Sequence, residues 1–311
     1  MSAPELRAAI DIGTNSVLLL VARVDPAAGT LERVVDRATI TRLGQGVDRA
    51  RALHPDAVER TLACLRAYAL ELQALGVQRP RVVATSAARD ASNADALLVP
   101  ARALLGAPVE TISGEREARL TFRGTLLGLG LAPETPCLTF DIGGGSTELT
   151  AGLAGAEPTF ARSLDVGSVR LTERHGREDP PSAETLQALD RVTREALGAL
   201  GAPPAHAVLV GSAGTVTSLS ALCHGVVPYE SSRIHGSRLD APSLDRLVRL
   251  LAGVPTAERA RLAALDPRRA DVIVAGAVLA RNVLRWAGDP EVRVSDGGVR
   301  VGLLLEPDES R

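Results

Sequence analysis

Apolar residues recur every three or four positions in several stretches of the chain, and short continuous apolar runs separate these stretches. Between residues 54 and 75, Val58, Leu62 and Leu65 have the spacing of one helical face, and Gly76 follows as a stop signal. The same pattern predicts further helices over residues 94–105, 115–127, 182–200, 243–251 and 271–286. Helices that alternate with apolar runs predict an α/β chain with mixed sheets flanked by helices.

Two of the apolar runs end in an aspartate and a glycine turn. The first reads Asp11-Ile-Gly-Thr-Asn-Ser16 and the second reads Asp141-Ile-Gly-Gly-Gly-Ser-Thr-Glu148, and each leads into another apolar run, so both predict a β-hairpin. A later pair of segments, residues 81–87 and 208–215, also corresponds, with Ser86 at 75 residues after Asp11 and Ser212 at 71 residues after Asp141. The recurrence of both features at nearly equal separation predicts a duplicated domain. We expect domain II to cover residues 129–299 and domain I residues 1–128, with the crossing in the Pro- and Gly-rich stretch 127–136.

The amino-acid composition excludes several kinds of mechanism and partner. All 35 basic residues among the 311 are arginine, so mechanisms that require a lysine amine, such as a Schiff base or a Walker A loop, are excluded. A formal net charge of −2 and 2% aromatic residues argue against a nucleic-acid partner. The three cysteines form no CxxC pair, and no run of 18 apolar residues or signal peptide is present. We therefore expect a soluble cytoplasmic protein that has neither a nucleic-acid nor a membrane partner.

The glycine turns carry the candidate chemistry. A Gly-rich turn presents backbone N–H groups to a phosphate without a Cβ clash, and the aspartate before it supplies oxygen ligands for Mg²⁺. A single such turn is also compatible with an ordinary β-turn, but two copies and the segment 211–215 favour phosphate binding. Arg89 offers a cation that grips phosphate with two hydrogen bonds, although its local sequence also fits a solvated helix start.

An ordered set of motifs covers essentially the whole chain, and it resembles the exopolyphosphatase / guanosine pentaphosphate phosphohydrolase (Ppx/GppA) family, in its short two-domain form. The motifs occupy residues 11–16, 42–46, 84–89, 112–119, 141–148, 163–172, 211–215 and 295–300. The resemblance implies two duplicated ribonuclease-H-like domains of the actin-like ATPase superfamily around a central cleft. It also implies that the C-terminal segment 300–311 completes domain I.

The resemblance further assigns roles to individual residues. Glu117 matches the catalytic glutamate that orients and deprotonates water, and Glu115 is a rival because Arg116 replaces a second glutamate of many relatives. Asp141 and Glu148 would be catalytic and, with Asp11, would hold Mg²⁺ or another divalent cation. The expected substrate-binding residues are Thr14, Asn15, Ser16, Arg89, Gly143, Gly144, Gly145, Ser146, Thr147, Gly211, Ser212, Ala213, Gly214 and Thr215. Arg269 and Asp271 are expected only to open a helix.

The implied activity is the Mg²⁺-dependent hydrolysis of a phosphoanhydride. The substrate would be inorganic polyphosphate, the 5′-phosphate of guanosine pentaphosphate, or both. Two alternatives belong to other functional classes: a kinase of the actin-like superfamily, and a regulator that binds guanosine tetraphosphate without turnover. The oligomeric state is not encoded in any motif, and a homodimer is a working expectation.

Overall fold

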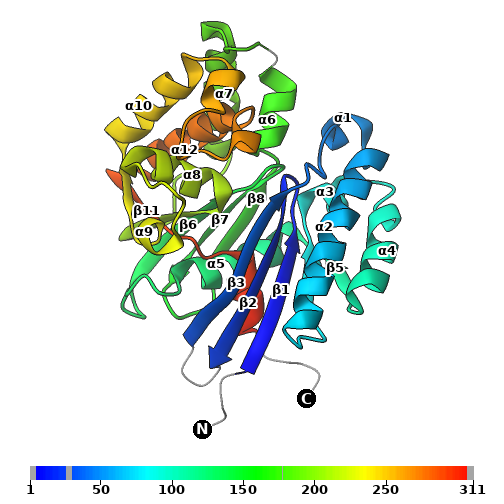
Figure 1. The fold of residues 1–311 in the computed structure, drawn as a ribbon. Helices are drawn as coiled ribbons and strands as arrows, with labels where there is room; N and C mark the ends of the chain where they lie inside the picture. Colours follow the sequence, from blue (N-terminus) through cyan, green and yellow to red (C-terminus); the bar gives the residue numbers. More distant parts are fainter. Residues whose placement is uncertain (1–4, 26–29, 177, 307–311) are drawn as a thin grey trace. The chain divides into compact units, whose positions relative to one another are not determined.

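The computed structural model describes residues 5–25, 30–176 and 178–306 of the chain (Figure 1). These residues form two compact units. Unit 1 comprises the described residues of Met1–Gly124 and Val299–Arg311, and unit 2 comprises those of Thr125–Gly298. Residues 307–311 of the expected C-terminal segment lie outside the described residues, as do residues 1–4, 26–29 and 177.

A five-stranded mixed sheet in the order β3-β2-β1-β4-β5 forms the centre of unit 1. Its first three strands pair antiparallel, and β4 and β5 continue the sheet parallel to β1. Ile10 and Ile12 of β1 belong to the hydrophobic core of the unit, and Ala9, the residue before Ile10, is also fully buried. Both faces of β1 are therefore covered in the middle of the strand, at residues 8–10. The strands are β1 Glu5–Ile12, β2 Ser16–Asp25, β3 Thr30–Ile40, β4 Arg81–Ala84 and β5 Val109–Thr111.

Six helices of the described residues lie in or begin in unit 1. The longest, α2, starts after His54, whose ring accepts the N–H of Asp56, and it has Pro55 in its first turn, where a missing N–H costs nothing. Helix α2 packs against α4, and α13 packs against β1 and β2. The helices are α1 Val47–Ala50, α2 Pro55–Ala74, α3 Ser86–Asp90, α4 Asp95–Leu105, α5 Gly114–Leu126 and α13 Val299–Leu305.

Unit 2 contains a six-stranded mixed sheet in the order β10-β11-β9-β6-β7-β8. Helix α12 is buried along most of its length and packs against α7, α10, α6 and α8. No helix in the described part of the chain is long and apolar enough to cross a membrane. The strands are β6 Pro136–Ile142, β7 Thr147–Leu153, β8 Phe160–Leu164, β9 Val208–Ser212, β10 Arg238–Asp240 and β11 Glu291–Val294. The helices are α6 Ser168–His175, α7 Ala183–Gly198, α8 Ala213–His224, α9 Ser231–Ile234, α10 Ala241–Ala252, α11 Thr256–Arg259, the 3₁₀ helix Pro267–Arg269 and α12 Ile273–Ala287.

The two units repeat one connectivity. In each, three consecutive strands form an antiparallel meander, and the first strand of that meander also pairs in parallel with a strand that comes later in the chain. The predicted α/β class and the predicted duplication are confirmed. One detail of the predicted repeat is wrong: the helix after the parallel strand is capped by Thr85 in unit 1 and by Ser212 in unit 2. Thr85, not Ser86, is therefore the counterpart of Ser212.

Candidate active site

The glycine turn of unit 2 connects β6 to β7 and is closed by a hydrogen bond from Gly143 N–H to Ser146 O (3.1 Å). Its carbonyl groups are occupied by the start of α6. The donors are Ser168 N–H to Gly143 O (3.0 Å), Val169 N–H and Arg170 N–H to Gly144 O (2.9 and 3.1 Å), and Arg170 Nε to Gly145 O (2.7 Å). The first turn of α6 thus binds the carbonyl oxygens of the glycine turn.

This arrangement determines where the turn's donors point. In a trans peptide the N–H is directed opposite to the preceding C=O. The N–H groups of Gly144, Gly145 and Ser146 therefore point away from α6, and they have no acceptor within the described residues. Successive backbone N–H groups of this kind form a concave anion-binding site. The turn has the geometry of a phosphate cradle.

Gly167 allows α6 to approach the cradle. A Cβ atom at this position would lie 2.5 Å from Gly144 O and 2.7 Å from the carbonyl carbon of Gly145. These contacts are with backbone atoms, which cannot rotate out of the way. A glycine also lies against the glycine turn of unit 1. A Cβ at Gly44 would lie 2.2 Å from Cγ2 of Thr14, which is part of that turn.

Gly167→Ala is accordingly expected to displace the cradle. We expect the free energy of unfolding to fall by about 1–3 kcal/mol, as in overpacked cores, and phosphate release to fall with it. Denaturant unfolding and a phosphate-release assay measure the two effects. Gly198→Ala is the matched control: its Cβ meets nothing within 4 Å, so stability should rise by about 0.5–1 kcal/mol with activity unchanged. Wild-type stability and activity in Gly167→Ala would contradict this account of the packing.

Asp141 and Glu148 stand directly opposite each other on β6 and β7, one on each side of the cradle. Because directly opposed residues of an antiparallel pair share one face of the sheet, the two carboxylates are neighbours. Ser212 Oγ donates to Asp141 Oδ2 (2.9 Å), and Ser163 Oγ donates to Glu148 Oε1 (2.7 Å). Burial raises the pKa of Asp141 to about 6, and the hydrogen bond from Ser212 opposes that rise.

This pair fits a magnesium ion. Within the described residues no group of three or more His, Cys, Asp or Glu side chains gathers into an all-protein metal site. Mg²⁺ is commonly held by only one or two carboxylates, with waters and substrate phosphates completing its shell. Two adjacent carboxylates, Glu148 buried and Asp141 half-buried, match this requirement, and a cation would offset the cost of removing their charge from water.

The corresponding turn of unit 1 differs in one respect. Gly13 N–H again bonds Ser16 O (3.0 Å), but the residue opposite Asp11 on the next strand is Leu18, at the register position of Glu148. The hairpin of unit 1 therefore carries an apolar residue at the position where unit 2 has its second carboxylate. Asn15 is 7% exposed, and its side-chain Nδ2 has no hydrogen-bond partner within the described residues, so it can donate to a ligand.

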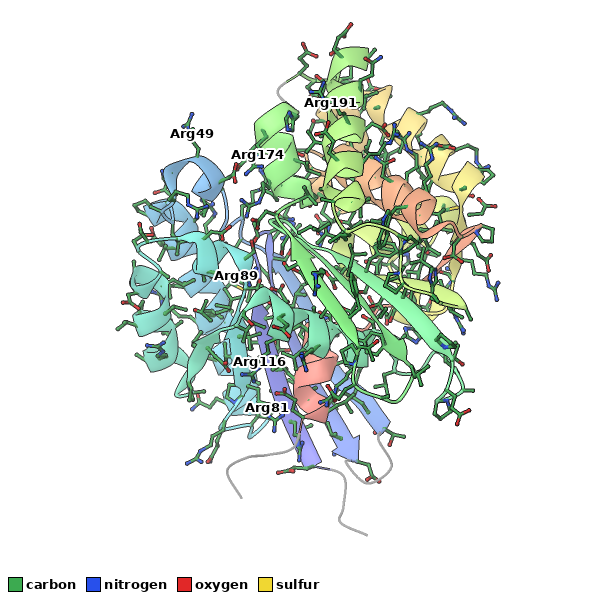
Figure 2. All side chains as sticks on the ribbon, turned by 180° about the vertical axis from the view of Figure 1, so that it is seen from behind. Arg49, Arg81, Arg89, Arg116, Arg174 and Arg191 are labelled. Atoms are coloured by element: carbon green, nitrogen blue, oxygen red, sulfur yellow. The ribbon has the colours of Figure 1, made fainter. Side chains whose placement is uncertain are left out.

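Glu117 and Arg89 form a pair that the sequence did not predict. Glu117 lies in the first turn of α5, is 8% exposed, and accepts a hydrogen bond from Arg89 Nη1 (3.1 Å). The same Nη1 also donates to Ile112 O (3.0 Å). Glu115 instead faces solvent and pairs with Arg119 (2.9 Å), while Arg116 pairs with Glu110. Arg89 and Arg116 are labelled in Figure 2. This geometry favours Glu117 over Glu115 as the base.

The segment 211–215 caps helix α8. Ala213 has a positive φ of 68°, a left-handed conformation that is uncommon outside glycine and that occurs at ligand-binding turns. A Cβ at Gly214 would lie 2.4 Å from Nη2 of Arg269, so the Arg269 guanidinium covers the N-terminus of α8. Burial lowers the pKa of Arg269. A half-buried cation beside the positive end of a helix dipole favours an anionic ligand there.

Arg269 therefore has a long-range contact that its local sequence does not show. Its neighbour Gly214 lies 55 positions earlier in the chain. Two predicted ligands, in contrast, have internal roles. The hydroxyl of Thr147 donates to Val166 O (2.6 Å), and the methyl group of Thr215 is packed against Gly276 of α12.

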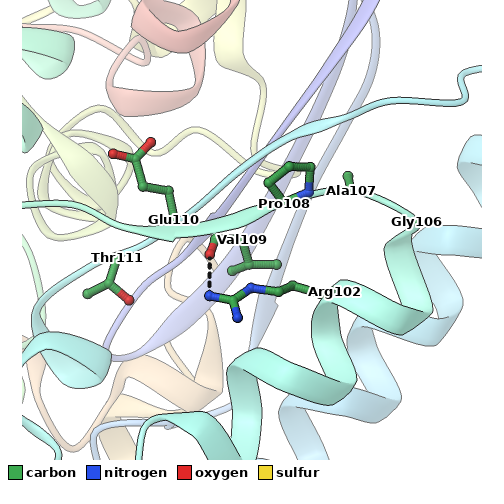
Figure 3. Close-up of a pocket in the computed structure, with 7 residues that line it drawn as sticks. All are labelled: Arg102, Gly106, Ala107, Pro108, Val109, Glu110 and Thr111. Atoms are coloured by element: carbon green, nitrogen blue, oxygen red, sulfur yellow. Dashed lines mark hydrogen bonds between the residues drawn. The ribbon is translucent and has the colours of Figure 1, made fainter.

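A separate pocket lies along β5 and the turn before it (Figure 3). Its charged side chains are already engaged: Arg102 Nη2 donates to Val109 O (3.2 Å) and Glu110 pairs with Arg116. None of the predicted site residues lines this pocket. Its lining residues are Arg102, Gly106, Ala107, Pro108, Val109, Glu110 and Thr111.

Comparison with known proteins supports the same interpretation of the motifs. Residues 20–310 match the model of the Ppx/GppA phosphatase family. The chain is 41% identical to exopolyphosphatase 2 of Mycobacterium tuberculosis over 96% of its own length and 97% of that protein. The solved structure of the Aquifex aeolicus PPX-GPPA enzyme is 33% identical with a TM-score of 0.80, covering 96% of this chain and 98% of that one. An exopolyphosphatase from Cytophaga hutchinsonii, 26% identical, gives a TM-score of 0.85 with 96% of each chain covered.

These matches extend over nearly the full chain and agree with the order of the motifs. Two units with mixed sheets of one connectivity confirm the predicted actin-like fold class. The hydrolase class is likewise supported by a family of phosphatases. The chain belongs to the Ppx/GppA phosphatase family.

Proposed function

We propose that the chain is a Mg²⁺-dependent phosphoanhydride hydrolase that releases terminal orthophosphate from inorganic polyphosphate. The 41% identity to an exopolyphosphatase over 96% of this chain and 97% of that protein supports this substrate. The cradle of Gly144, Gly145 and Ser146 amides, bracketed by Asp141 and Glu148, is the structural observation that carries the proposal. A terminal phosphoryl group needs fixed donors and neutralised charge. The turn offers the donors, and a cation held by the two carboxylates would supply the neutralising charge.

Glu117 is the general base in this proposal. Its buried carboxylate accepts a proton from the attacking water, and the hydrogen bond from Arg89 fixes its orientation. Among the described residues, the bonds of Arg89 to Glu117 and Ile112 both use Nη1, so Nε and Nη2 are available to bind a phosphate oxygen. The amides of the cradle donate to the terminal phosphate, and Asn15 and Arg269 add donors to the phosphates.

Asp141 and Glu148 would hold the magnesium ion, with Asp11 as a further carboxylate on the phosphate side. When bound, the ion neutralises phosphate oxygens and lowers the barrier to displacement of the leaving group. The protein's own contribution is to orient the two carboxylates through hydrogen bonds from Ser212 and Ser163.

A second substrate, the 5′-phosphate of guanosine pentaphosphate, presents the same type of bond. The 33% identity to the Aquifex aeolicus PPX-GPPA enzyme favours including this nucleotide as a substrate.

Two arginines bear on the choice between a long polymer and the nucleotide, because a polymer channel needs positive charge. Both arginines form bonds within unit 1 instead: Arg81 donates to Glu306 O (2.8 Å), and Arg116 pairs with Glu110. Both are labelled in Figure 2.

A phosphate-release assay with Mg²⁺ tests the proposal. Short polyphosphate, long polyphosphate and guanosine pentaphosphate are compared as substrates, each with an EDTA control. We expect release from polyphosphate that EDTA abolishes. Release from the nucleotide alone would overturn the first substrate, and acceptor-dependent ADP formation from ATP would indicate a kinase. Nucleotide binding without any release would indicate a regulator.

A further inference from the structure

Thr125 uses its hydroxyl differently from Thr61 and Thr193, two other fully buried threonines in helices. Each of those two donates to the carbonyl four residues earlier, at 2.8 Å, the usual local bond of a helical threonine. Thr125, near the end of α5 and fully buried, donates instead to Ser212 Oγ at 3.1 Å. Its partner lies 87 positions away, at the end of β9.

The bond from Thr125 determines the direction of a hydrogen-bond chain. Ser212 is also fully buried, and its single proton is donated to Asp141 Oδ2 at 2.9 Å. An ionised carboxylate can only accept, so the protons run from Thr125 to Ser212 to Asp141. The alternative acceptor for Ser212, the carbonyl of Phe140, lies farther away at 3.4 Å. By occupying a lone pair of Ser212, Thr125 favours the conformer that points at Asp141.

We propose that Thr125 is a positioning residue for Asp141. It keeps the Ser212 proton on Oδ2, which leaves Oδ1 of Asp141 for the cation and prevents the carboxylate from rotating. The inference rests on the proposed function, because it takes Asp141 as a metal ligand. Partners that hold a ligating carboxylate by hydrogen bonds typically account for 10–100-fold in metal affinity. Thr125 itself touches neither metal nor substrate.

Binding of Mn²⁺ alone to the free enzyme tests the proposal, with unbound Mn²⁺ counted by electron paramagnetic resonance. Thr125→Val preserves shape and removes the hydroxyl, and we expect it to weaken Mn²⁺ binding about 10-fold. Thr125→Ser restores the hydroxyl and should restore affinity. Thr61→Val is the matched control, a fully buried helical threonine that bonds only its own helix and should leave Mn²⁺ affinity unchanged.

Thermal melts separate positioning from folding. A Thr125→Val variant that melts at a lower temperature but binds Mn²⁺ like the wild type would overturn the proposal and leave the metal assignment intact. Asp141→Asn is measured alongside it. If Asp141→Asn retains wild-type Mn²⁺ affinity, the metal assignment of the proposed function is wrong and the role of Thr125 falls with it. We expect Asp141→Asn to lose Mn²⁺ binding and Thr125→Val to lose part of it. Thr125→Ser should bind Mn²⁺ like the wild type.

Discussion

Replacing Glu117 with glutamine is expected to lower the rate of phosphate release by about 10²–10⁴-fold while the chain remains folded. The amide oxygen of glutamine can still accept the hydrogen bond from Arg89, so the local packing survives. The amide cannot accept a proton from water, so base catalysis is lost. Initial rates at saturating polyphosphate, with a thermal melt on the same samples, measure the two properties separately.

Glu115→Gln is the control for this prediction. Glu115 lies two residues away on the same helix, is exposed, and forms only a surface pair with Arg119, which contributes little to stability. Its replacement should leave turnover close to the wild-type rate. Near-normal release by Glu117→Gln, or an equal loss in both variants, would refute the assignment of Glu117 as the base.

Asp141→Asn is expected to have opposite effects on activity and stability. Burial raises the pKa of Asp141 to about 6, which means that the ionised form is less favourable in the folded chain than in the unfolded one. At pH 8, a neutral amide of similar size removes this cost and can still accept from Ser212. The melting temperature in EDTA should therefore rise on the order of 2–4 °C. Phosphate release should fall roughly 10³-fold, since several kcal/mol of charge stabilisation is lost with the metal ligand.

Two comparisons make this prediction specific. Added Mg²⁺ should raise the melting temperature of the wild type and leave that of Asp141→Asn unchanged. Asp240→Asn is the control at an exposed helix cap, where hydrogen bonds from Ser243 lower the pKa of the aspartate. That variant should gain no stability and keep its activity. A lower melting temperature for Asp141→Asn than for the wild type in EDTA would show that the ionised Asp141 carboxylate does not destabilise the folded chain.

Features written in local sequence were predictable. Helix α2 was expected over residues 54–75 and runs from Pro55 to Ala74, because its apolar face, its first-turn proline and its final Gly76 are all local signals. The two glycine turns were found for the same reason. Helix α8 was not predicted as a helix: it is buried on most sides, so its apolar residues show little periodicity.

Features that depend on distant contacts were not predictable. The pairing of Arg89 with Glu117 spans 28 positions, and the approach of Arg269 to Gly214 spans 55. Gly167 resembles any loop glycine until α6 is placed against the cradle. The match of Ser86 to Ser212 was wrong by one position because two consecutive hydroxyl residues, Thr85 and Ser86, look equivalent until the helix cap is known.

The leucine opposite Asp11 has a consequence for the history of the chain. A duplication creates two identical halves, and here one half pairs Asp141 with Glu148 while the other pairs Asp11 with Leu18. Under the proposed roles, the second half specialises in holding the cation and the first supplies the base, Glu117. A chain made of two first halves would have the general base twice but no carboxylate pair to hold the cation. A chain made of two second halves would have the carboxylate pair twice but no general base. Neither half, doubled, would reproduce the enzyme.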